Sequence, residues 1–324
     1  MSLNPRRNWL VSRTALVLVV GSLSMACGDD TDSRPPAHDA GTPDAAAPAA
    51  GKRGGGSGGS GAKAGKAVTI RFRAAVADRD FSCRERYEAM GSKKTAVVPA
   101  DFRFYVQDLE LIDAEGKEVP VELDKRAPWQ TEDVALLDFE DMQGRCHGTP
   151  ETNTTITGRV PDGTYHGVVF TNGVPEALNH LEQSKQPAPL DVTDLYWAWL
   201  TGYRFMVAEL LQDDASAAAD ADAGSTLAGI GLMHIGSTAC RRDQGCTKAN
   251  RNSVRLSDFD PSKDVIVADI AAIFEATDLS QDMQCHSADA ICAPMFERVG
   301  VSFEDGKSLD KQKLYRVAKA KDGE

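Results

Sequence analysis

The sequence predicts an all-β fold, a disulfide-stabilised β-sandwich with long loops and short helical turns. Short runs of alternating apolar and polar residues recur along the chain, and Pro/Gly turn signals separate them. No segment sustains an apolar period of 3.6 residues, so long helices are not expected. Many short strands with frequent turns are typical of a sandwich.

The strands follow from this alternation. Val68–Val76 is the clearest, with apolar residues at every second position. In Phe102–Leu111 the alternation changes phase at Gln107–Asp108, which predicts a β-bulge. The turn Pro161–Gly163 predicts a hairpin between its two flanking strands. Other strands are expected at Val119–Leu123, Val134–Glu140, Thr154–Val160, Tyr165–Phe170, Arg204–Leu211, Leu227–Ile235, Val254–Leu256, Val265–Ile270 and Lys313–Val317, and helical turns at Glu176–Glu182 and Ala271–Ala276.

The N-terminal region predicts export. Residues 1–26 combine three arginines with the apolar run Ala15–Val20 and end in small residues before Cys27, as in a lipoprotein signal peptide with Cys27 as the lipidated residue. Residues 27–66, rich in Gly, Ala, Pro and Ser, predict a flexible tether. The folded domain is therefore expected at residues 67–324, in a periplasmic, outer-membrane or cell-surface lipoprotein.

The charge balance restricts the partners. The leader holds three of the 36 Lys and Arg residues and none of the 48 Asp and Glu residues, so the exported chain has a net charge of −15. An acidic chain is a poor partner for nucleic acid or anionic lipid. We therefore expect no nucleic-acid partner, and membrane attachment through the lipid anchor only.

Six cysteines remain beyond Cys27. An even number in an exported protein favours disulfides. The spacing favours Cys240–Cys246 and Cys285–Cys292 as short loops, with Cys83–Cys146 joining distant segments. A zinc site is the alternative, but spacings of five and six intervening residues do not match the usual short ligand pairs. No CxxCH motif for covalent haem is present.

The segment Val168–Phe205 predicts a long functional loop, because it is rich in Trp, Tyr and Leu but lacks regular periodicity. Trp197 and Trp199 have period two and would point the same way on a strand; core packing is the alternative role for at least one of them. His180 lies in the same loop, and His234 ends a later strand. His147 and His286 follow cysteines, which favours a role in ordering those loops.

Catalytic motifs are absent. The sequence contains no GxSxG, HExxH, GxGxxG or P-loop in the expected domain. The carboxylates Asp138, Glu140 and Asp141 are expected to be solvated, as most acidic pairs are in an acidic chain. A non-enzymatic protein is therefore expected, and a hydrolase would need a nucleophile or water-activating pair that the sequence does not offer.

An ordered set of motifs resembles the MbnP-like family, the exported four-Cys proteins called the metallo-mystery pair. Together with Phe81–Cys83, these motifs cover most of Ala67–Leu256 in family order. They are DFRFYVQDLELID (Asp101–Asp113), VALLDFE (Val134–Glu140), GRCHGTPETN (Gly144–Asn153), GVPEALNH (Gly173–His180), PLDVTDLYWAWLTGYRF (Pro189–Phe205) and HIGSTAC (His234–Cys240).

The resemblance implies one copper ion bound by two histidines and a tryptophan that has been converted to kynurenine. It also implies a role in copper acquisition or homeostasis, and a di-haem c-type partner of the MauG/peroxidase type (MbnH-like) that oxidises the tryptophan. By motif, the metal residues would be His180, His234, Trp197 and Trp199, with His166 and Trp129 as substitutes. The alternative function is a surface adhesion or small-ligand-binding lipoprotein, in which the aromatic loop holds a sugar or peptide and the histidines are structural.

Overall fold

The computed structural model describes residues 65–213, 230–242 and 244–321. The predicted signal peptide, Cys27 and nearly all of the tether lie outside these residues, as does most of the acidic segment Gln212–Thr226. In the described part of the chain, no helix is both long and apolar enough to cross a membrane.

The first sheet has the strand order β19-β17-β1-β8-β6, with β2 paired to β1. Strand β1 is antiparallel to β8 and parallel to β17. The alternation at Val68–Val76 thus forms a central strand, as the sequence predicts. The members of this sheet are β1 (Lys66–Val76), β2 (Arg79–Asp80), β6 (Glu122–Leu123), β8 (Thr155–Val160), β17 (Asp264–Asp269) and β19 (Tyr315–Lys319).

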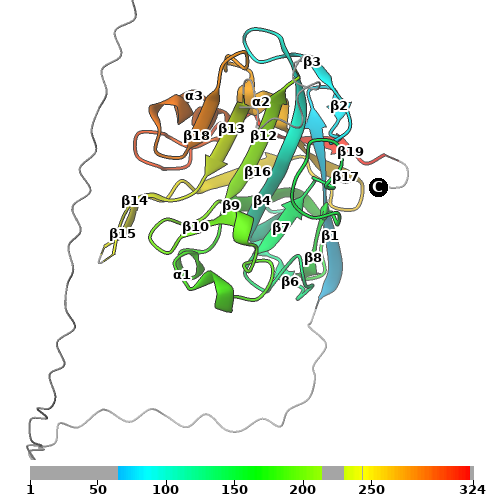
Figure 1. Cartoon of the computed structure of the whole chain (residues 1–324). Helices are drawn as coiled ribbons and strands as arrows, with labels where there is room; N and C mark the ends of the chain where they lie inside the picture. The colour runs from blue at the N-terminus through cyan, green and yellow to red at the C-terminus, as the bar shows by residue number, and fades with distance from the viewer. Residues whose placement is uncertain (1–64, 214–229, 243, 322–324) are drawn as a thin grey trace, which may run out of the picture. The chain divides into compact units, whose positions relative to one another are not determined.

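The second sheet has the order β16-β9-β4-β12-β13-β18, and β3, β5 and β7 also pair with β4 (Figure 1). The register of β4 shifts between Gln107 and Glu110, and Asp108 has a φ of 49°, so the predicted bulge is present. The members are β3 (Tyr87–Met90), β4 (Thr95–Asp113), β5 (Glu118–Pro120), β7 (Ala135–Asp138), β9 (Tyr165–Asn172), β12 (Met206–Gln212), β13 (Ile230–Ile235), β16 (Asn252–Ser257) and β18 (Met283–His286).

The two sheets pack face to face through aromatic side chains. Phe72 and Tyr315 of the first sheet each contact Phe104 and Phe170 of the second in edge-to-face geometry, with ring centroids 5.2 to 6.1 Å apart. All four rings are buried. The predicted all-β sandwich is therefore confirmed, with an apolar core between its sheets.

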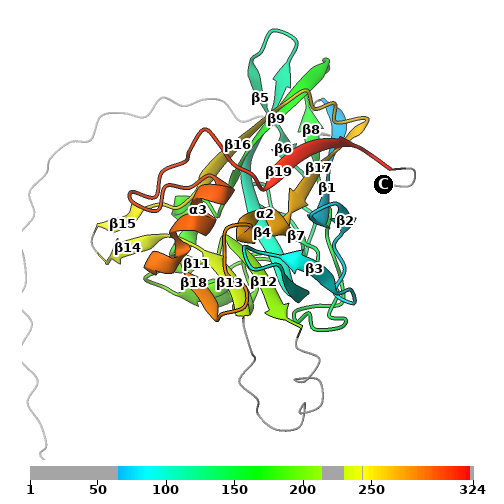
Figure 2. The same ribbon diagram turned by 90° about the horizontal axis from the view of Figure 1, so that it is seen from above.

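Short helices and two hairpins complete the domain. In Figure 2, α2 and α3 lie side by side, and the hairpin of β14 and β15 projects from the body. The helical turns predicted near Glu176 and Ala271 are present as α1 and α2, whereas α3 was not expected. The elements are α1 (Glu176–Asn179), α2 (Ile270–Phe274), α3 (Ala293–Val299), η1 (Gln183–Lys185), η2 (Thr193–Leu195), η4 (Ala290–Cys292), β10 (Tyr196–Ala198), β11 (Gly202–Tyr203), β14 (Thr238–Arg241) and β15 (Gly245–Lys248).

The hairpin prediction across Pro161–Gly163 is wrong. Strand β8 pairs with β1 and β6 in the first sheet, whereas β9 pairs with β4 and β16 in the second. The turn therefore carries the chain from one sheet to the other. Both kinds of connection need the same turn residues between two alternating strands, so the local sequence cannot distinguish them.

The described residues contain the disulfides Cys83–Cys146, Cys240–Cys246 and Cys285–Cys292. These are the pairs that the spacing favours. Cys83–Cys146 ties the loop after β2 to the loop after β7, across 63 positions of sequence. The other two close loops of six and seven positions, as expected.

The loop between β9 and β12 covers the face of the second sheet that points away from the core. Tyr105 of β4 packs edge-to-face on Tyr203, with centroids 5.9 Å apart. The two hydroxyls donate to the carbonyls of Pro189 and Leu190 at 2.8 and 2.6 Å. The backbone N–H of Tyr203 in turn donates to Asn179 Oδ1 at 3.0 Å. The loop predicted to carry the site is therefore ordered and anchored to this outer face.

Candidate metal centre

A row of side chains crosses the outer face of the second sheet. The register places Arg103 of β4 opposite Asp138 of β7 on one side and opposite Val207 of β12 on the other. His234 of β13 lies opposite Val207, and His286 of β18 lies opposite His234. Opposed residues of a sheet project from the same face, so these side chains, far apart in sequence, converge there.

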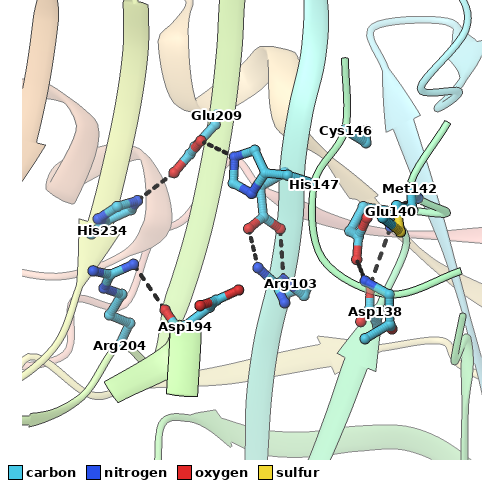
Figure 3. Close-up of polar contacts among 12 residues, drawn as sticks. Arg103, Asp138, Glu140, Met142, Cys146, His147, Asp194, Arg204, Glu209 and His234 are labelled. Atoms are coloured by element: carbon cyan, nitrogen blue, oxygen red, sulfur yellow. Dashed lines mark hydrogen bonds and ion pairs between the residues drawn. The ribbon is translucent and has the colours of Figure 1, made fainter. Parts of the chain in front are cut away.

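Glu209 lies beside this row and links two histidines. Its Oε1 accepts a hydrogen bond from His234 Nε2 at 2.7 Å, and its Oε2 accepts one from His147 Nε2 at 3.0 Å (Figure 3). Burial alone would raise the pKa of Glu209, but the two histidine bonds outweigh it and lower the pKa to about 2. Glu209 is therefore ionised and can only accept, so both Nε2 atoms carry the proton.

His234 is held as a neutral imidazole with one free nitrogen. Its side chain is buried, and this desolvation lowers its pKa despite the bond to Glu209. Because Nε2 donates to Glu209, the lone pair lies on Nδ1. Nδ1 is buried and has no hydrogen-bond partner among the described residues. A histidine whose N–H is fixed by a carboxylate and whose other nitrogen is free is in the state required of a metal ligand.

Trp197 and His286 lie on either side of His234. The Trp197 ring is 6.4 Å from the His234 ring and the His286 ring is 5.3 Å from it, measured between centroids. Trp197 also lies under the guanidinium of Arg204, at 5.7 Å. Gly236 admits the indole, because a Cβ at this position would lie 2.6 Å from Trp197 Cζ3. The structure therefore groups one indole with two imidazoles.

His180 pairs with the other tryptophan of the loop. Its ring lies 6.4 Å from that of Trp199, and its Nδ1 donates to the Trp199 carbonyl at 3.0 Å. Trp199 follows the end of β10 and is 44% exposed. The period-two prediction for the two tryptophans assumed a continuous strand, but the strand ends at Ala198. The four motif residues thus form two pairs, His234 with Trp197 and His180 with Trp199.

The two substitute residues have other surroundings. His166 on β9 is exposed, and its carbonyl accepts the N–H of Phe259 at 3.0 Å. Trp129 is partly buried against the hydrophobic core. Neither residue has a ring contact with a histidine or tryptophan among those found in the described residues.

The expectation that Asp138 and Glu140 are solvated is wrong. Both are buried, at 2% and 0% exposure, near the equally buried Arg103. Arg103 donates from Nε to Asp101 Oδ1 at 2.8 Å and makes a second bond to Oδ2. Glu140 accepts backbone N–H groups from Thr149 and Met142, at 2.8 and 3.0 Å. Burial raises the pKa of Asp138 to about 8. These acids therefore belong to a buried polar network and are not solvated at the protein surface.

Asp101, His147 and Glu209 also bring potential ligand atoms within 4.8 Å of one another. However, the Arg103 guanidinium already neutralises the Asp101 carboxylate. A cation at this position would face that fixed positive charge. Of the two clusters, the one around His234 therefore offers the better metal site.

Sequence reasoning gave too little weight to His286 and His147, and did not consider Glu209. A signal for Glu209 exists, because it is the single charged residue in the apolar strand MVAELLQ. A charge in a strand that is buried on both faces needs a partner. No comparable signal marks His286, since only the pairing of β18 with β13 brings it to His234.

Comparisons with known proteins identify the family of this chain. No match was found among curated protein sequences. The solved structure of MbnP from Methylosinus trichosporium is similar, with 28% identity and a TM-score of 0.69, covering 79% of this chain and 99% of that one. The MbnP family profile matches residues 65–287, which include every strand of the two sheets except β19 and all of the residues around His234. The chain belongs to the MbnP family.

Proposed function

We propose that this protein binds one copper ion at His234 and His286, together with the amine of a kynurenine formed from Trp197. The observation that carries the proposal is the buried, unpartnered Nδ1 of His234 beside a second imidazole and an indole. Imidazole nitrogens suit copper. His286 is exposed, so copper would have access from the surface.

Modification of Trp197 would supply the missing donor. Indole offers an N–H donor and no usable lone pair. Oxidative cleavage of the indole C2–C3 bond adds two oxygen atoms in a four-electron oxidation, with two peroxide molecules as oxidant leaving as water. Hydrolysis then releases C2 as formate and leaves an aromatic amine, with a mass gain of about 4 Da. That amine has a lone pair for a metal.

The oxidant would act through a partner protein. The family resemblance points to a di-haem c-type protein, for which this chain would be a substrate. In this proposal the protein is not an enzyme. It is exported, attached to a membrane through lipid on Cys27, and serves copper acquisition or homeostasis.

Copper content tests the proposal directly. The protein is purified after production with and without the haem partner, and copper is measured per chain. We expect about one copper only with the partner, and loss of copper in His234→Gln and in His286→Gln, because each removes a ligand. His166→Gln is the matched control and should keep copper. Equal, negligible copper in all samples would reject the proposal.

The same variants separate the two histidine pairs. If His180→Gln loses copper while His286→Gln keeps it, then the metal lies at the His180–Trp199 pair and the assignment to Trp197 is wrong. Unchanged metal in all variants, with binding of a sugar or peptide to the aromatic loop, would favour the adhesion alternative instead.

A further inference from the structure

The disulfide Cys240–Cys246 differs from the other two in accessibility. Both of its cysteines are partly exposed, whereas Cys83, Cys146, Cys285 and Cys292 are all buried. It closes the projecting hairpin, in which Cys240 of β14 and Cys246 of β15 are directly opposed. A thiol reductant in solution would therefore reach this disulfide before the others.

His180 faces this disulfide with the lone pair of its Nε2, which accepts a hydrogen bond from the Asn179 amide. A carbonyl can only accept, so the 3.0 Å contact with the Trp199 carbonyl places the His180 proton on Nδ1. Nε2 then carries the lone pair and lies 3.3 Å from Cys246 Sγ. The Asn179 amide donates to the same Nε2 at 3.1 Å and is also 3.5 Å from Ser237 Oγ, so it has a second partner if it is displaced.

There is room at this position. A cavity of about 110 Å³ is lined by His180, Trp199, Cys240, Arg241 and Arg242, among other residues. This volume exceeds the roughly 30 Å³ that a water molecule occupies in the liquid. Two arginines next to Cys240 would also favour the thiolate form of a reduced cysteine.

We propose that Cys240, Cys246 and His180 form a second metal site that opens on reduction and takes a soft monovalent cation, Cu(I). A dithiol reductant donates two electrons to the S–S bond, which breaks and takes up two protons to give two thiols, while the reductant becomes a disulfide. Binding of Cu(I) then releases the thiol protons. The ligands are the two sulfur atoms and His180 Nε2.

The distances and the ligand chemistry fit this site. Metal–sulfur and metal–nitrogen bonds of about 2.3 and 2.0 Å at a tetrahedral angle separate the two ligand atoms by about 3.5 Å. The present separation of 3.3 Å is therefore close to that of two ligands of one ion. Soft thiolate ligands favour Cu(I), and imidazole also suits copper.

The hairpin would remain in place after reduction. Thr238 and Lys248 pair across its base. The Asn250 amide donates to the Gly236 carbonyl at 2.7 Å and to Thr238 Oγ1 at 3.1 Å. Lys248 Nζ donates to the Phe303 carbonyl at 2.8 Å. These contacts fix both strands where they leave the domain, so reduction frees the sulfur atoms without releasing the hairpin.

The test uses the full exported chain with the substitution His234→Gln, which removes a ligand of the copper site proposed above. Any Cu(I) that this variant binds therefore reports on the second site alone, so the two proposals can fail independently. The protein is reduced anaerobically with a dithiol and no denaturant, the reductant is removed, and thiols are counted. Cu(I) affinity is then measured by competition with a chromophoric Cu(I) chelator. We expect two thiols per chain and one Cu(I), and neither in Cys240→Ser/Cys246→Ser.

The histidine distinguishes this site from an ordinary dithiol. His180→Gln should still give two thiols but weaken Cu(I) binding by about tenfold or more, the scale on which metal sites respond to loss of an ordered group. The control His166→Gln should leave the Cu(I) affinity unchanged. Absence of native-state thiols, release of all six thiols together, or equal Cu(I) affinity in His180→Gln and the parent would each overturn the proposal.

Discussion

The bond between Glu209 and His234 decides which nitrogen of the imidazole is free. Glu209 Oε1 and His234 Nε2 are 2.7 Å apart, and the ionised carboxylate can only accept. The proton therefore lies on Nε2 and the lone pair on Nδ1, which is buried without a partner among the described residues. A buried polar atom without a partner costs free energy, so the fold retains an unfavourable feature where a metal would relieve it.

Removal of this carboxylate should weaken copper binding. In Glu209→Leu the His234 proton is no longer fixed on Nε2, and we expect copper affinity to fall by about 10 to 100-fold. Glu209→Gln keeps one acceptor oxygen, so copper affinity should fall less in this variant. Affinity is measured by chelator competition, with circular dichroism to verify the fold. Glu110→Gln, on the partly exposed side of β4, is the control. Equal affinity in Glu209→Leu and wild type would exclude this role.

Gly236 should be needed to position Trp197. In Gly236→Ala the new Cβ would lie 2.6 Å from Trp197 Cζ3 and 2.4 Å from the Tyr203 carbonyl oxygen, too close for either atom. The ring must shift, at a cost of about 1 to 3 kcal/mol in the free energy of unfolding. Urea unfolding and tryptophan fluorescence measure both effects.

The matched control for that change is Gly163→Ala. There the added Cβ would make only ordinary contacts, the nearest being 3.5 Å from the Tyr165 hydroxyl. It should alter neither fluorescence nor stability by a comparable amount. If Gly236→Ala behaved like Gly163→Ala, the indole would not be held against β13 as described.

Asp138 should make the fold less stable as the pH rises. Burial raises its folded-state pKa to about 8 from an ordinary value of 3.8. The unfolded chain therefore loses this proton from about pH 4, while the folded chain keeps it until about pH 8. Across that interval the residue lowers the free energy of unfolding by at most about 1.4 kcal/mol per pH unit.

Denaturant unfolding at several pH values measures this dependence. Asp138→Asn removes the titrating group and should gain stability relative to wild type as the pH rises from 4 to 8. Asp133→Asn, at an exposed position, should follow wild type. Parallel curves for Asp138→Asn and wild type would show that Asp138 is already ionised in the folded protein.

Local patterns in the sequence were sufficient for most strands and for the bulge near Asp108, because alternation and phase are properties of neighbouring residues. They were insufficient for the turn at Pro161–Gly163, since pairing depends on which sheet receives each strand. The disulfide pairs followed from spacing alone, because two of them close loops of six and seven positions.

The site was predictable only in part for the same reason. Motif resemblance drew attention to His234 and Trp197, and the structure brings these two together. His286 reaches His234 through a parallel pairing across 52 positions of sequence, which no local pattern encodes. Asp138 and Glu140 were predicted to be solvated because Arg103, which lies near them in the fold, is on a strand far away in sequence.

Mass mapping of tryptophan modification tests the central claim most directly. The protein is produced with its haem partner and digested, and the peptides that carry Trp129, Trp197 and Trp199 are compared with those from protein made without it. Fragmentation of the peptide that carries both Trp197 and Trp199 locates the change, and a gain of about 4 Da on Trp197 alone, in protein that contains copper, is the predicted result. The same gain on Trp129 or Trp199, or copper bound with all tryptophans unmodified, would contradict it.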